Sequence, residues 1–130
     1  KEYGINASNH NHWFAPVRAY IEDCLLGAAG PLKSKQNMRW IGSLVADCNR
    51  ILMRGGVFLY PADDRKGYAQ GRLRLLYECA PVAFVIEQAG GMASTGTQRI
   101  MDVTVETLHQ RVPFIFGSSE TVAKIETYHS

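Results

Sequence analysis

The chain has few cysteines, and they are poorly placed for a covalent framework. Cys24, Cys48 and Cys79 are odd in number, widely spaced and form no C-x-x-C pair. This spacing argues against a disulfide scaffold and against a structural zinc site, and it is typical of a reducing compartment. We therefore expect a cytoplasmic location.

Long apolar runs and strong net charge are also missing. No apolar run approaches the length of a membrane span. Lys and Arg total 14 against 12 acidic residues, a net charge of +2, and the arginines form no cluster with interleaved aromatics. We therefore expect neither a membrane nor a nucleic acid as partner. The first residue is Lys1 rather than Met, which is compatible with a start inside a longer protein.

Familiar catalytic signatures are absent as well. The sequence contains no G-x-S-x-G, no Walker loop and no G-x-G-x-x-G, and it has no internal repeat. What it does have is the composition of one globular domain, with 46% hydrophobic and 20% charged residues in 130.

Periodicity and breakers predict alternating strands and helices, and hence an α/β layer structure. Helices are predicted over residues 13–26, from a Ser43 N-cap to Gly55, from about Glu78–Pro81 to Gly90, and from Ser118 to Tyr128. Strands are predicted over residues 1–5, 57–60, 72–75, 92–94, 100–103 and 113–116.

Polar residues stand where three of these predicted strands end. Asn6, Tyr60 and Glu78 each follow an apolar or alternating run. Ligands of α/β sheets tend to bind beyond the carboxyl ends of strands. Each residue nevertheless has two interpretations: Asn6 is a turn residue or a ligand contact, and Tyr60 is a buried aromatic or a phosphate donor. Glu78 is a carboxylate favoured by a helix dipole or a ligand for Mg²⁺.

Arginines offer further candidates. Arg39 lies just before the capped helix at Ser43, so it is either a solvated surface residue or a bidentate phosphate clamp beside a helix N-terminus. Arg72 and Arg74 alternate with leucines; one can snorkel over the sheet edge while the other reaches a ligand. The histidines at 10 and 12 lack neighbouring acidic or thiol ligands, which favours a polar loop over a metal site.

Three stretches resemble one known family. They are NMRWIGSLVADCNRILMRGGVFLYP at residues 37–61, GRLRLLYECAPVAFVIEQAGG at 71–91, and LHQRVPFIFGS at 108–118. They resemble the C-terminal domain of class I fructose-1,6-bisphosphatases, and the wording is most similar to the bacterial branch of that family. The resemblance implies a layered α/β/α fold with a central mixed sheet of about five strands. It also implies that an N-terminal metal and AMP domain, with its D-P-x-D-G-S motif, lies outside residues 1–130.

The resemblance implies an activity for the parent protein. This is Mg²⁺-dependent hydrolysis of the 1-phosphate of fructose 1,6-bisphosphate, a step of gluconeogenesis and carbohydrate metabolism, by a homo-oligomer (dimer or tetramer). The isolated chain is expected to be inactive. Two alternatives remain open: a non-catalytic sugar-phosphate binding or assembly module, and a part of a sedoheptulose-1,7-bisphosphatase.

The resemblance also implies roles for individual positions. Glu78 matches a catalytic carboxylate that ligates the metal. Asn6, Tyr60 and Arg39 match contacts to the sugar 6-phosphate, and Arg39 matches an arginine that reaches into the neighbouring subunit's site.

Further positions match contacts to the sugar or depart from the family pattern. Gly42, Ser43 and Leu44 match a backbone stretch that touches the sugar. Arg72 stands where a lysine is frequent, and Trp40 and Asn9 stand where phosphate-binding tyrosines are frequent.

Overall fold

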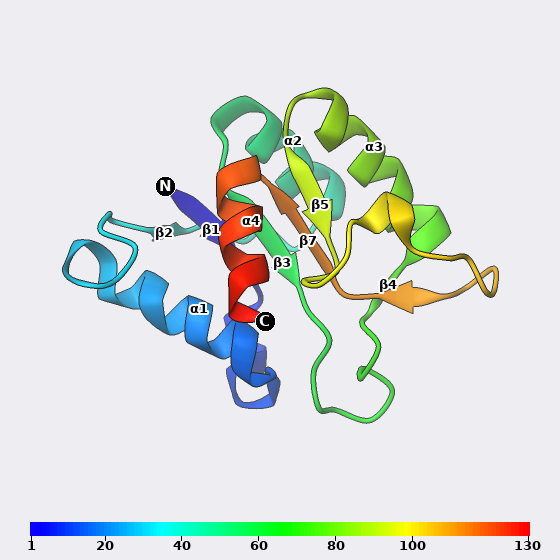
Figure 1. Ribbon diagram of the computed structural model, residues 1–130, viewed down its shortest axis with the longest axis horizontal. Coiled ribbons are helices and arrows are strands. Elements are labelled where there is room, and N and C mark those ends of the chain that lie inside the picture. The colour runs from blue at the N-terminus through cyan, green and yellow to red at the C-terminus, as the bar shows by residue number, and fades with distance from the viewer.

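A five-stranded mixed sheet forms the middle layer of the computed structural model, which describes residues 1–130 (Figure 1). β1 pairs in parallel with both of its neighbours, whereas β7 is antiparallel to both of its own. The strands run in the order β2 (Asn37–Met38), β1 (Glu2–Gly4), β3 (Val57–Tyr60), β7 (Phe114–Gly117) and β5 (Met92–Ser94).

Two pairs of helices cover the sheet. Because strand side chains alternate between faces, Val57 and Leu59 pack on one side while Phe58 packs on the other. The first side is covered by α1 (Ala15–Leu26) and α4 (Ser119–Tyr128), and the second by α2 (Leu44–Arg54) and α3 (Ala80–Gln88). The predicted layered α/β/α fold with a mixed sheet of about five strands is confirmed.

Each face of the sheet has a separate apolar core. On the α2–α3 side, three phenylalanines pack together: the rings of Phe58 and Phe116 lie 4.9 Å apart, and those of Phe114 and Phe116 lie 5.0 Å apart. Trp40 extends this stack, because its ring lies 5.4 Å from that of Phe58 and nearly parallel to it. The stack therefore connects the core to the segment that precedes α2.

The predicted strand over residues 72–75 lies outside the central sheet. β4 (Leu73–Arg74) pairs with β6 (Arg111–Val112) in a separate two-stranded sheet. A π-helical turn, η3 (Leu75–Cys79), joins β4 directly to α3. Glu78 thus stands at a strand-to-helix joint, as predicted, but at the end of this small sheet.

Some local predictions are wrong or incomplete. Residues 100–103 are not a strand: Ile100–Asp102 form the 3-10 turn η4, in which Ile100 is buried while Met101 is exposed. The polar segment after Asn6 is a 3-10 helix, η1 (Ala7–His12), and a short 3-10 turn, η2 (Gly27–Ala29), follows α1.

Two glycines allow neighbouring main chains to lie very close together at one end of the sheet, where β7 pairs antiparallel with β3. Gly117 has φ +150° and Gly56 has φ +111°, values that side chains disfavour. A Cβ on Gly117 would overlap the carbonyl oxygen of Gly56. This end of β3 is opposite to the one that carries Tyr60.

None of the helices combines the length and the apolar character that crossing a bilayer requires. All three cysteines are free thiols and buried.

Candidate functional site

Asn6 and Tyr60 meet at one edge of the sheet. Tyr60 is the last residue of β3, and Asn6 follows the end of β1. Because β1 and β3 are parallel, their carboxyl ends lie side by side. Both residues line one small pocket, which Asn9 and Trp40 also line. Two of the three positions expected to depart from the family pattern therefore belong to the same pocket as the two predicted contacts, and the third, Arg72, does not line it.

Polar atoms in this pocket are left without partners in the chain. The Asn6 side-chain oxygen accepts a hydrogen bond from the Ser8 amide at 3.1 Å and caps η1. Its amide nitrogen therefore remains a free donor. The hydroxyl of half-buried Tyr60 also has no hydrogen-bond partner among the residues of the chain. A neutral donor pair of this kind suits the oxygens of a phosphate.

The loop after β3 carries cationic groups, one of which pairs with a residue of this pocket. Asp63, which also lines the pocket, accepts hydrogen bonds from the Arg65 side chain, the shortest at 2.7 Å. The Arg65 guanidinium lies 4.1 Å from the centroid of the Tyr68 ring, and that of Arg72 lies 5.1 Å from the same ring. Arg72 is exposed, whereas Arg65 is already paired, so Arg72 is the cation free to meet an anion.

Asp63 is almost fully buried and still charged. Burial alone would raise the pKa of this carboxyl, but the hydrogen bonds and the positive charge of Arg65 outweigh that effect and lower its pKa below the ordinary value. Asp63 also fixes the loop backbone, since its amide donates to the Tyr68 carbonyl oxygen.

Glu78 lies on the π-helical turn η3 and has one oxygen engaged. Its Oε1 accepts from the Arg74 amide at 3.0 Å and faces the Arg74 Nε at 3.6 Å. Its Oε2 makes no hydrogen bond within the chain, and the side chain is 32% exposed. Single π-helical turns occur frequently at functional sites. Arg74 itself lies over the Tyr77 ring, so it serves Glu78 rather than a distant ligand.

No metal site is complete within residues 1–130. The chain contains no group of three or more His, Cys, Asp or Glu side chains arranged to hold an ion. Glu78, with one unengaged carboxylate oxygen, has the chemistry of a single hard ligand for a divalent cation. The remaining ligands of any such ion would have to come from outside these residues.

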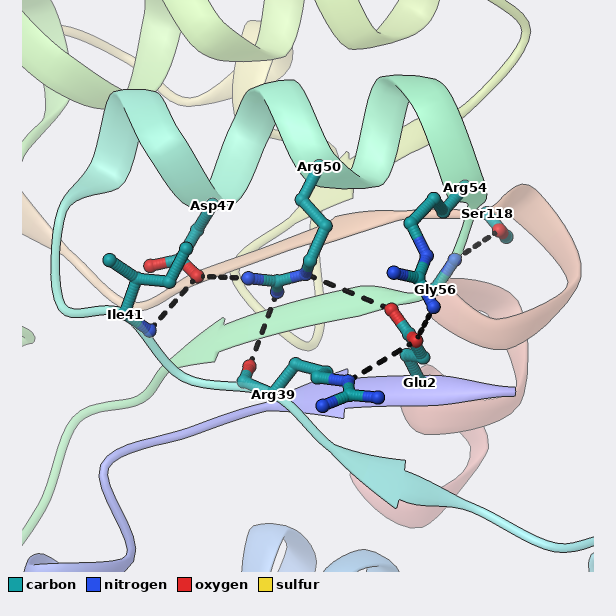
Figure 2. A network of polar contacts seen from close by, with 8 residues as sticks. All are labelled: Glu2, Arg39, Ile41, Asp47, Arg50, Arg54, Gly56 and Ser118. Carbon is teal, nitrogen blue, oxygen red and sulfur yellow. Dashed lines mark hydrogen bonds and ion pairs between the residues drawn. The ribbon is translucent and has the colours of Figure 1, made fainter.

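Arg39 does not line the pocket. It follows the edge strand β2, and its Nε faces the Glu2 carboxylate at 3.4 Å (Figure 2). The Arg39 side chain is 54% exposed. Of the residues predicted to contact the 6-phosphate, the structure therefore brings together Asn6 and Tyr60 and leaves Arg39 on another surface.

Ser43 and Leu44 begin α2, as predicted, but Ser43 does not cap the helix with its hydroxyl. Sequence reasoning missed Asp47, whose carboxylate instead accepts from the Ile41 amide (Figure 2) and from the Gly42 amide. A signal was available, because Asp47 falls on the apolar stripe of α2, three residues after Leu44 and four before Ile51. A carboxylate at a core-facing position needs partners.

A layered α/β domain with polar side chains beyond the ends of parallel strands belongs to the class that binds small ligands at a sheet edge. The particular family follows from comparison with known proteins. The family model described as "Fructose-1-6-bisphosphatase, C-terminal domain" matches residues 1–130, and the chain belongs to this family.

Relatives agree with this assignment. The chain is 63% identical over 128 residues to the class 1 fructose-1,6-bisphosphatase of Paracoccus denitrificans and 60% identical over 129 residues to that of Rhodopseudomonas palustris. These alignments span 98–99% of this chain but only 38–39% of the two relatives. The crystal structure of Leishmania major fructose-1,6-bisphosphatase in its T-state superposes with a TM-score of 0.91 at 36% identity, covering 99% of this chain and 39% of that one.

Proposed function

We propose that residues 1–130 are the substrate-binding C-terminal domain of a longer Mg²⁺-dependent phosphatase. The parent protein would remove the 1-phosphate of fructose 1,6-bisphosphate and release fructose 6-phosphate. The observation that carries the proposal is the match of the whole chain to the C-terminal domain of this family. The pocket shared by Asn6 and Tyr60 supports it from the structure.

In this proposal the sugar 6-phosphate binds at the mouth of this pocket, against the side chains that line it. The free amide of Asn6 and the hydroxyl of Tyr60 donate to phosphate oxygens, and Arg72 contributes positive charge from the adjacent loop. Ser43 and Leu44 lie at the start of α2, where their backbone groups touch the sugar. Holding the remote phosphate positions the reacting end of the substrate.

Glu78 acts at that reacting end as the catalytic metal ligand of this domain. Its free Oε2 would bind a magnesium ion, which supplies neutralisation of phosphate charge and activation of water when bound. Arg74 orients the carboxylate by donating to its other oxygen through the backbone amide. The N-terminal part of the parent protein would provide the remaining ligands.

Arg39 contributes to substrate binding through the assembly of subunits. Its side chain is exposed, pairs with Glu2 and lies away from the pocket of its own subunit, so in this proposal it gives up that pairing to reach the site of a neighbouring subunit. The parent protein is accordingly proposed to be a dimer or tetramer. We also propose a cytoplasmic location, in keeping with the three free thiols.

The lining of the pocket favours a second substrate. Asn9 and Trp40, which both line the pocket, stand where the sequence resemblance implies tyrosines. A differently shaped phosphate pocket supports additional turnover of sedoheptulose 1,7-bisphosphate. The ratio of kcat/KM for the two sugars measures this preference.

The decisive experiment is Glu78→Gln in the full-length parent protein. Loss of a direct ligand is expected to lower kcat by at least about 100-fold, since even partners behind the ligands matter 10- to 100-fold. Phosphate release from fructose 1,6-bisphosphate at saturating Mg²⁺ gives the readout. Glu120→Gln, at an exposed position of α4, is the matched control and should retain full activity. Unchanged activity in Glu78→Gln would favour a non-catalytic sugar-phosphate binding or assembly module.

A further inference from the structure

The segment from Arg39 to Ser43 connects β2 to α2 and is held by side chains of α2 itself (Figure 2). This segment carries Trp40, which lines the pocket, and it ends next to Ser43 and Leu44. Its backbone has few ladder bonds of its own, because β2 comprises only two residues. Something else must fix its conformation.

Asp47 supplies part of that restraint. Its Oδ1 accepts from the Ile41 amide at 3.3 Å, and its Oδ2 accepts from the Gly42 amide at 3.2 Å. The side chain is fully buried. A buried carboxylate is stable only with such partners, so the segment and the carboxylate depend on each other.

Arg50 completes the restraint from the next turn of α2. Its Nη1 donates to Asp47 Oδ1 at 2.6 Å, and its Nη2 donates to the Arg39 carbonyl oxygen at 3.2 Å. Its Nε faces Glu2 Oε1 on β1 at 3.8 Å, within ion-pair range. A guanidinium can make these contacts at once because its donors lie in a planar fork.

The direction of the Asp47 contacts separates positioning from ordinary helix capping. An acid in the first helical turn stabilises the helix through its dipole wherever it points. Both oxygens of Asp47 instead reach back to amides that precede the Ser43 N-cap. The carboxylate therefore fixes the connecting segment in addition to the helix.

We propose that Asp47, together with Arg50, is a positioning residue that sets the backbone of residues 39–43 for recognition of the sugar phosphate. The inference rests on the proposed function, because it takes the pocket lined by Trp40 as the phosphate site. Asp47 touches no substrate in this account. It acts through the segment that does.

Asp47→Asn in the full-length parent protein tests the proposal. The asparagine side chain keeps one acceptor oxygen, but its NH2 group then faces a backbone N–H, so two donors oppose each other and one hydrogen bond is lost. The KM for fructose 1,6-bisphosphate should rise about tenfold, and the inhibition constant of fructose 6-phosphate should rise by the same factor, while kcat stays within about twofold. Hydrogen exchange of the Ile41 and Gly42 amides should become faster.

A merely structural role predicts a different pattern. Partial unfolding lowers the concentration of active enzyme, which reduces the apparent kcat and leaves KM unchanged. Asp102→Asn is the matched control, since Asp102 forms the same kind of i,i+3 pair with Arg99 far from this segment. It should change neither constant. If Asp47→Asn does not fold, Arg50→Lys replaces it, with an expected rise of KM of about threefold through loss of the second donor.

The outcomes distinguish the two proposals. Hydrolysis with an unchanged KM in Asp47→Asn, or unchanged exchange at Ile41 and Gly42, would overturn the positioning role alone. Absence of hydrolysis by the unsubstituted parent protein would overturn the proposed function, and the positioning role with it.

Discussion

Asp63 carries a charge that is stabilised chiefly by Arg65, through its side chain and its backbone amide. Because the pKa of this carboxyl is lower in the folded chain than in the unfolded one, its contribution to stability is present above the unfolded value, about 3.9, and is lost as pH falls through the lower folded value. Asp63→Asn should therefore destabilise the chain near neutral pH. The difference from the unsubstituted chain should shrink below about pH 4.

Urea unfolding of the two chains at a series of pH values measures this effect. Asp64→Asn provides the control, since Asp64 is the adjacent acid but is 58% exposed and pairs only with His12. A difference between Asp63→Asn and the unsubstituted chain that grows toward acidic pH would contradict the prediction.

The predicted site residues show what sequence reasoning can reach at this scale. Asn6, Tyr60 and Glu78 could be singled out because strand ends are readable from periodicity and from residues such as Pro61. The sequence could not predict which polar atoms of these side chains form hydrogen bonds within the chain and which remain free. That Glu78 has only one engaged oxygen depends on the Arg74 amide, and this geometry arises from a π-helical turn that periodicity does not predict.

Asp47 was missed for a related reason. Its position on the apolar stripe was readable, but its partners are backbone amides that come within reach only when residues 39–43 fold back over α2. Contacts to backbone groups leave no signature in residue identity. The same holds for Arg50 and the Arg39 carbonyl oxygen.

At the scale of elements, the close approach of β7 to the residue before β3 leads to a specific prediction. Gly117→Ala should destabilise the chain by at least about 3 kcal/mol, since a new methyl group would overlap the Gly56 carbonyl oxygen in addition to straining the backbone. Gly67→Ala shares a positive φ of 85° but would meet no atom within 4 Å. It should cost only about 1 kcal/mol.

Urea denaturation of both variants gives the comparison. The difference between them isolates steric overlap from backbone strain. Equal losses of unfolding free energy in the two variants would show that the close approach at Gly117 contributes nothing of its own.

Strands bounded by clear breakers were predictable, whereas β2 and β6 were not. The strands at residues 57–60 and 92–94 coincide with β3 and β5, because clear breakers bound each apolar run. β2 and β6 contain two residues each and exist only through pairing with distant partners. The strand predicted at residues 100–103 was wrong because these residues pair with no other strand and form a 3-10 turn instead.

For the whole molecule, we expect residues 1–130 to fold alone and yet release no phosphate. Two separate clusters of twelve buried residues each give the chain a core on both sides of the sheet. Its candidate chemistry includes a single carboxylate and no complete metal site. Circular dichroism with cooperative urea unfolding tests folding, and phosphate release with Mg²⁺ and fructose 1,6-bisphosphate tests activity. Robust turnover by the chain alone would contradict the expectation that catalysis needs residues outside 1–130.

The close passage of β3 and β7 also affects how sequence variation in this protein should be interpreted. In a library of random substitutions, positions 56 and 117 would be purged of nearly every replacement. Such intolerance, next to the start of α4, would imitate the signature of an anion-holding loop. It would instead record main chains that lie too near each other for any methyl group, since a Cβ at position 117 would meet the Gly56 carbonyl oxygen and one at position 56 would meet the Glu2 carbonyl oxygen, at the end of β3 farthest from Tyr60.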